Sequence, residues 1–150
     1  MFSGKPIDYQ DATLKNVGFW PDLSLKEFQV QRTIPPDVDA GTVAQALITA
    51  AGEVNSDLAS VEAKHHANGY SHAAEVPGVS IDTENLLCAQ YKKAVYARAK
   101  ADLLGEFATI GRRESHPGQE SDETRKGLLA ESSIVIRRMK GLKRVTVRQV

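Results

Sequence analysis

Apolar residues recur every three or four positions between about Asp39 and Asn68, which is the spacing of one face of an α-helix. The stripe consists of Val43, Leu47, Ala50, Val54, Leu58, Val61 and His65. No proline interrupts this stretch, and Gly69 follows where a left-handed C-cap would end it. The pattern therefore predicts a helix of about eight turns, roughly 40–45 Å long. Small residues on its polar face leave room for a second layer of packing, from this chain or from a copy of it: Ala44, Ala51, Gly52 and Ala59.

A short helix is predicted before this long one. Ser24-Leu25-Lys26-Glu27 fits a capping box, in which Ser24 caps the helix and the Glu27 side chain reaches back to the backbone of Ser24. The helix would end near Arg32, because a residue that precedes a proline, such as Ile34 before Pro35, is pushed out of the helical region.

Two more helices are predicted after the long one. Ile81-Asp82-Thr83-Glu84 marks a restart with Asp82 as its cap, and helical spacing of apolar residues then continues until Gly111. The last helix would run from about Ser121 to Lys140, capped by Ser121 or Asp122 and ended by Gly141. Together the patterns predict an all-α fold, a bundle of three to four helices with one long central helix.

The two ends of the chain lack helical spacing. Met1 to Asn16 reads as an irregular arm, so we divide a single domain of residues 1–150 into an N-terminal arm (1–18), a helical bundle (19–141) and a C-terminal tail (142–150). In the tail, Val145 and Val147 alternate with polar residues, which is the period of a β-strand. A lone strand in a helical chain either pairs with another molecule or stays loose, and we favour pairing with a neighbour by strand addition.

Charge is spread unevenly along the chain. Lysine and arginine together equal aspartate and glutamate at 19 each, yet six basic residues and no acid lie between Arg137 and Val150. The tail is therefore expected to meet an acidic surface. The single cysteine, Cys88, excludes an internal disulfide and predicts a small buried thiol. The first residues lack the apolar core of a signal peptide, and no apolar run is long enough to cross a bilayer, so we expect a soluble cytoplasmic protein without a membrane partner.

Candidate chemistry is sparse. Glu62 and His65 have the Glu-x-x-His spacing of di-iron bundles, but a second copy of that motif is missing, and the neighbouring His66 points about 100° away from His65 on a helix. We find no phosphate-binding loop and no nucleophile elbow. We therefore expect no catalytic residues, no metal and no cofactor. Two alternatives stay open: a small helical DNA-binding regulator that uses the basic segment Arg137–Arg148, and a metal-dependent enzyme around Glu62 and His65.

A set of landmarks along the chain resembles a known family. In order they are Phe19-Trp20-Pro21-Asp22, Arg32 ahead of Pro35, Asn55-x-x-Leu58, Gly69-Tyr70, Val76-Pro77, Tyr91-x-x-Ala94-Val95 with Ala99 and Ala101, and the ending Gly141-x-x-Arg144-x-x-Val147-x-Gln149-Val150. Their order and spacing from Phe19 to Val150 is similar to the GpL family of head completion proteins from temperate contractile-tailed bacteriophages.

The resemblance implies a structural virion protein rather than an enzyme. Members of such a family form a ring, usually of twelve copies, beneath the portal after DNA packaging, retain the genome and offer a surface to tail completion proteins. Double-stranded DNA would pass through the lumen without sequence readout, and assembly would take place in the host cytoplasm. The expected portal-binding residues are Arg144, Val145, Val147, Arg148, Gln149 and Val150. The residues that we expect between subunits are Trp20, Val43, Leu47, Tyr91 and Val95.

Overall fold

The computed structural model describes the backbone of residues 11–110 and 118–142, with the side chains of residues 11–104 and 124–142. In chain order the elements are β1 (Thr13–Leu14), β2 (Leu23–Ser24), α1 (Leu25–Gln31), α2 (Ala40–Asp57), α3 (Ala59–Ala67), the 3₁₀ turn η1 (Ala73–Glu75), β3 (Ser80–Ile81), β4 (Glu84–Asn85), α4 (Leu86–Ile110) and α5 (Gly118–Met139). Most of the described chain is helical, as predicted.

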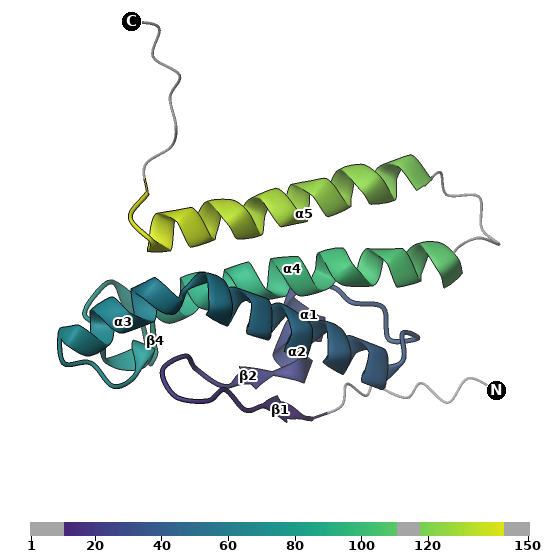
Figure 1. The fold of residues 1–150 in the computed structure, drawn as a ribbon. Helices are drawn as coiled ribbons and strands as arrows, with labels where there is room; N and C mark the ends of the chain where they lie inside the picture. Colours follow the sequence, from purple (N-terminus) through teal and green to yellow (C-terminus); the bar gives the residue numbers. More distant parts are fainter. Residues whose placement is uncertain (1–10, 111–117, 143–150) are drawn as a thin grey trace, which may run out of the picture.

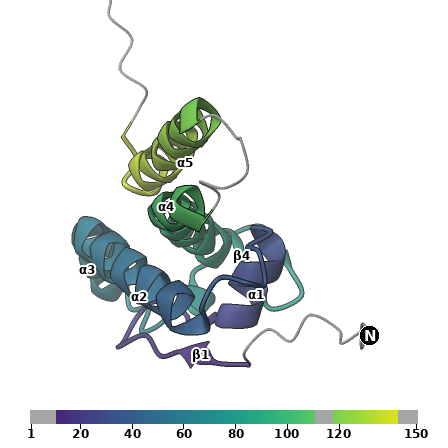
Figure 2. The ribbon, with the colours of Figure 1, turned by 90° about the vertical axis from the view of Figure 1, so that its right-hand side faces the viewer.

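Helix α4 occupies the middle of the bundle. It lies between α5 on one side and α1, α2 and α3 on the other, and it runs antiparallel to both α2 and α5 (Figures 1 and 2). The prediction that the 39–68 helix is the central one is therefore wrong. Because α4 is covered from two sides, its neighbours approach closely only where its side chains are small, and Ala94, Ala97, Ala99 and Ala101 are buried to 1% exposure or less.

The stretch from residue 39 to residue 68 forms two helices rather than one. Leu58, with φ −98° and ψ 12°, separates α2 from α3, but the backbone bonds from Leu58 N to Val54 O (2.9 Å) and from Glu62 N to Leu58 O (3.0 Å) continue across the break. The predicted ends are confirmed. The Asp39 carboxylate accepts a hydrogen bond from Thr42 N at 3.1 Å. At the other end Gly69 has a φ of +94°.

Ser24 caps α1 as predicted, because its Oγ accepts a hydrogen bond from Glu27 N at 3.1 Å. The second half of the predicted capping box is wrong. The Glu27 carboxylate turns away from Ser24 and binds Lys92 and Tyr96 of α4. A charged partner, Lys92, and a polar partner, Tyr96, therefore take the place of the Ser24 backbone amide.

The expected helical restart at Ile81 is a β-hairpin. Ser80 pairs with Asn85 and Ile81 with Glu84, and Asp82 sits in the turn with a φ of +51°, a left-handed conformation that aspartate tolerates better than most residues. Asp82 is therefore not a helix cap. Asn85 takes that role, since its Oδ1 accepts a hydrogen bond from Cys88 N at 2.9 Å.

Two residues of the predicted N-terminal arm form a β-strand. Thr13 pairs with Ser24 and Leu14 with Leu23 in a second small antiparallel sheet, and Leu25 N donates to Ala12 O at 2.9 Å. The prediction of an irregular arm is thus wrong for residues 13–14, and residues 1–10 lie outside the described part. The all-α prediction holds for the bulk of the fold but omits these two short sheets.

Helix α5 begins at Gly118, so Ser121 and Asp122 lie inside the helix and the prediction that one of them caps it is wrong. Its C-terminal end is as predicted. Gly141 has a φ of +74°, and Leu142 N donates to Arg137 O at 2.9 Å, closing the last turn.

Candidate functional site

The predicted portal-binding residues lie outside the described part of the chain. All six belong to residues 143–150: Arg144, Val145, Val147, Arg148, Gln149 and Val150. The structure does place the start of the tail. Gly141 ends α5 and Leu142, the last described residue, is 51% exposed. Arg138 and Lys140 are exposed beside it, so the end of the helix continues the positive charge of the tail sequence.

The five residues expected between subunits are packed inside one subunit. Trp20, Val43, Leu47, Tyr91 and Val95 are all exposed by 3% or less. Trp20 and Tyr91 stack with ring centroids 4.8 Å apart and planes at 5°, which joins the N-terminal segment to α4. Their role between copies stays a prediction, whereas their part in the core of the subunit is shown.

A closed set of hydrogen bonds surrounds the Tyr91 hydroxyl. It donates to Asn55 Oδ1 at 2.6 Å and accepts from Asn16 Nδ2 at 2.9 Å, while Asn55 Nδ2 donates to Asn16 Oδ1 at 2.9 Å. Burial raises the pKa of Tyr91 to about 12, although the hydrogen bonds of Asn16 and Asn55 act in the opposite direction. This triangle ties α2, α4 and the segment after β1 together, and it holds a neutral phenol rather than a reactive one.

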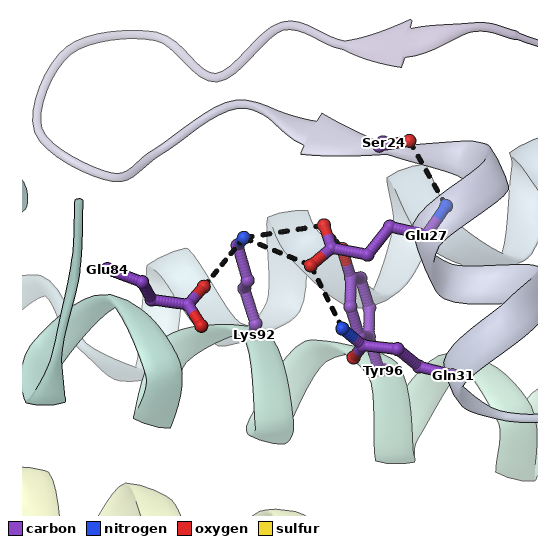
Figure 3. Close-up of polar contacts among 6 residues, drawn as sticks. All are labelled: Ser24, Glu27, Gln31, Glu84, Lys92 and Tyr96. Atoms are coloured by element: carbon purple, nitrogen blue, oxygen red, sulfur yellow. Dashed lines mark hydrogen bonds and ion pairs between the residues drawn. The ribbon is translucent and has the colours of Figure 1, made fainter. Parts of the chain in front are cut away.

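A second polar cluster lies between α1, the hairpin and α4 (Figure 3). Lys92 Nζ bonds Glu27 Oε1 at 3.2 Å and Glu84 Oε1 at 2.7 Å, and the Tyr96 hydroxyl donates to Glu27 Oε2 at 3.1 Å. Gln31 adds a hydrogen bond to Glu27 Oε1 at 3.0 Å. One ammonium group thus faces two carboxylates, so the cluster fixes the orientation of α1 and of the hairpin on α4.

The burial and the charges of this cluster shift the pKa values of Lys92 and Tyr96. Burial disfavours the charged form of Lys92, but its bonds to Glu84 and Glu27 outweigh that effect and raise its pKa. Burial, together with the charge of Glu27, raises the pKa of the Tyr96 hydroxyl above its usual range. Both groups therefore remain protonated in the folded protein at neutral pH.

We expect the protein to lose stability at alkaline pH. Tyr91, Tyr96 and Lys92 all have raised pKa values in the folded protein. Their contribution to the free energy of unfolding is therefore complete below pH about 10 and is lost as the pH rises through their pKa values in the folded state. For Tyr91 the change from 10.0 to about 12 corresponds to roughly 2–3 kcal/mol. Lys100 acts in the opposite sense, since burial and Arg32 lower its pKa. Urea unfolding at several pH values measures this.

The control for that measurement is Tyr91→Phe, which removes the titrating hydroxyl. Its free energy of unfolding is expected to fall less steeply between pH about 10 and about 12 than that of the unchanged protein. Parallel slopes for the two proteins would show that the Tyr91 phenol does not contribute to alkaline unfolding.

Two arginines connect α4 and its neighbours. Arg32, at the end of α1, pairs with Glu131 of α5 at 2.9 Å and reaches Lys93 O at 3.4 Å. Arg98 of α4 pairs with Asp57 at 3.1 Å and with Glu53 at 3.4 Å, both on α2. These partly exposed pairs add orientation more than stability.

The histidines at the end of α3 serve packing and local hydrogen bonding. The His65 ring stacks on Phe19 with centroids 5.7 Å apart and planes at 8°. His66 Nε2 lies 3.5 Å from Glu62 Oε2, and His66 Nδ1 lies 3.0 Å from Tyr70 O. Among residues with described side chains, no three histidine, cysteine, aspartate or glutamate side chains gather as a metal site would require.

Cys88 is buried near the start of α4, as predicted. Burial raises the pKa of its thiol, which disfavours the reactive thiolate. Within the described residues, no helix is long and apolar enough to cross a membrane.

The sequence analysis missed the role of three residues. Asn16, Glu84 and Lys92 each hold two elements together, and Asn16 and Lys92 each lie far along the chain from at least one partner. A pairing over 39 to 75 positions leaves no local signal in a single sequence.

Comparison with known proteins shows which sequences this chain is similar to. Residues 14–150 match the family model described as phage head completion protein (GPL). The chain is 42% identical over 147 residues, 98% of each protein, to the "Probable head completion/stabilization protein" of Haemophilus phage HP1 (strain HP1c1). It is 26% identical over 100 residues, 67% of this chain and 59% of the relative, to the "Head completion/stabilization protein" of Escherichia phage P2. No solved structure matches the chain.

Proposed function

This chain belongs to the phage head completion protein (GPL) family, and from that membership we propose that it is an adaptor of the head–tail connector. In this role several copies, twelve by the expectation for the family, form a ring beneath the portal once DNA is packaged. The ring retains the genome and offers a surface to tail completion proteins. The family match, which runs to the last residue of the chain, is the observation that carries this proposal.

The C-terminal tail is the part that we propose to dock on the portal. Gly141 ends α5 sharply and Leu142 is exposed, so the tail starts at the surface of the bundle. Its alternating pattern suits an added strand on the edge of a portal sheet. Val145, Val147 and Val150 would then fill pockets on one face, while Arg144 and Arg148 pair with acidic residues.

Encapsidated double-stranded DNA is the second proposed partner. A ring beneath the portal encloses the path of the DNA, so its contacts are with phosphate groups and carry no sequence preference. The exposed Arg138 and Lys140 at the end of α5 supply positive charge suited to such contacts.

Truncation after Gly141 tests the docking. We expect the shortened protein to keep the melting temperature of the full chain, because the described core lies before that residue, and to lose binding to portal protein and to tail-less heads. Co-sedimentation with heads measures binding, and circular dichroism measures folding.

A matched pair of substitutions refines the same test. Val145→Ser with Val147→Ser changes one face of the proposed strand, whereas Thr146→Ala changes the other. The first variant is expected to bind heads weakly and the second normally. Unchanged head binding by the truncated chain would refute the docking role of the tail.

The exposed basic end of α5 also suits the alternative of a small nucleic-acid-binding regulator. That function requires specific DNA binding by the free protein, with an affinity that falls steeply with salt. The adaptor function requires no sequence-specific DNA binding, so binding of the free chain to a preferred DNA sequence would favour the regulator.

A further inference from the structure

Three large apolar side chains gather on the surface at the hairpin that leads into α4. Val79 is 75% exposed, Ile81 is 82% exposed and Leu86 is 47% exposed. The hydrogen bond from Leu86 N to Val79 O, 2.8 Å long, brings two of them together. A cluster of exposed branched side chains marks an interaction surface more often than isolated ones do.

The hairpin is held firmly by the rest of the subunit. Asn85 Nδ2 donates to Ala73 O and to Val76 O, both at 2.8 Å. Glu84 is anchored to Lys92 at 2.7 Å (Figure 3). A surface that is already ordered loses little entropy when a partner binds it. We call Val79–Leu86 the docking hairpin.

A groove of about 320 Å³ lies between α2, α4 and α5. Small residues line it, namely Ala46 and Ala50 of α2 and Ala101 of α4. Leu129 of α5, which is 36% exposed, adds an apolar wall, and Arg125 lines the groove with its side chain exposed. Its other lining residues are polar or charged, namely Thr49, Glu53, Arg98, Asp102 and Ser133. The groove therefore has a small apolar floor beneath a polar rim, which is the usual make-up of a protein–protein contact surface.

One subunit cannot fill its own groove with its own hairpin. The docking hairpin meets α4 at Leu86, whereas the groove lies beside residues 98–102 of the same helix, about 20 Å further along at about 1.5 Å per residue. Two different complementary surfaces on one chain produce a head-to-tail contact, and such contacts form a ring when the rotation from copy to copy closes.

The groove is lined by two arginines and two carboxylates, of which Arg98 and Glu53 pair with each other. Arg125 can therefore form one pair with an acidic residue of the neighbouring copy. Asp82 is exposed at the turn of the docking hairpin, and Arg125 is exposed at the groove. Neither side chain forms an ion pair with the described residues. A pair between them would add direction and register to the apolar contact.

We propose that the docking hairpin of one subunit fills the α2–α4–α5 groove of the next copy. Ile81 rests on the alanine-lined floor of the groove beside Leu129, and the Asp82 carboxylate pairs with the Arg125 guanidinium of the neighbouring copy. The proposal rests on the proposed ring and identifies the contact that builds it.

A charge-exchange experiment on the full chain tests this contact. Asp82→Arg and Arg125→Asp alone are each expected to weaken self-association at least about tenfold, and the chain that carries both changes is expected to regain most of it. Ile81→Ser should also weaken it. The matched control is Lys126→Asp, which makes the same charge change on the next residue of α5. Sedimentation over a range of concentrations measures association, with melting temperature as the check on folding.

Imaging of each variant on tail-less heads separates this contact from the proposed function. Normal rings on heads from both single variants would overturn the hairpin contact and leave the adaptor function intact. If Ile81→Ser lost head binding but kept self-association, the docking hairpin would belong to another head protein, which also overturns the proposal. Absence of any ring from the unchanged chain, in solution and on heads, would overturn both the contact and the adaptor function.

Discussion

Replacing Trp20 by alanine is expected to lower the free energy of unfolding by about 3–5 kcal/mol. Trp20 is only 3% exposed. Its ring stacks on Tyr91 at 4.8 Å and meets Phe19 edge to face at 4.8 Å. The alanine variant loses both aromatic contacts and leaves a cavity where the N-terminal segment meets α4. For a chain of this length the melting temperature should fall by roughly 6–20 °C.

The matched control is Val17→Ala, three positions earlier. Val17 is 94% exposed, so its truncation should change the free energy of unfolding by less than about 0.5 kcal/mol. Circular dichroism is the suitable probe, because Trp20 is the single tryptophan of the chain. Equal melting temperatures for the two variants would contradict the placement of Trp20 in the core.

Replacing Ser132 by leucine is expected to detach α5 from α4. Ser132 is fully buried at this contact, with 0% exposure, and its Oγ donates to Ala94 O at 2.9 Å. Leucine removes that hydrogen bond and forces extra carbon atoms against Ala94, which is also fully buried. Together these effects should cost about 2–4 kcal/mol.

The loss of packing caused by Ser132→Leu should be confined to α5. In Figure 2, α5 lies against α4 on the side away from α1, α2 and α3, so α5 can open while the other helices remain packed. Hydrogen exchange should therefore show lost protection in α5 and smaller changes in α2. Ala130→Leu, an exposed site on the same helix, is the control. Uniform loss of protection over all helices would contradict an independently opening α5.

Local signals predicted the helical part of the fold. The three- and four-residue spacing between Val43 and Val61 located α2 and α3, and Gly69 and Gly141 marked true helix ends because both adopt a positive φ. The single-residue break at Leu58 was not predicted, because leucine there continues the apolar stripe and the backbone hydrogen bonds hardly change.

The errors arose where pairing between segments decides the structure. Asp82 has the chemistry of a helix cap, but strand pairing of residues 80–81 with 84–85 uses it in a turn. Glu27 fits a capping box, yet Lys92 on α4 attracts its carboxylate. Likewise, the position of α4 at the centre depends on how the helices pack, which spacing within each helix does not encode.

The candidate site was predicted unevenly. The family was identified correctly from dispersed landmarks between Phe19 and Val150. The residues expected between subunits pack within one subunit, because apolar spacing marks burial without saying in which molecule. The docking hairpin was missed, since Val79, Ile81 and Leu86 are unremarkable until the fold leaves them exposed together.

Electron microscopy of tail-less phage heads, with and without added protein, tests the central claim most directly. The adaptor function predicts a ring of extra density beneath the portal vertex after addition of the full chain, and none after addition of the chain ending at Gly141. Heads that gain no density at that vertex from the folded full chain would contradict the account.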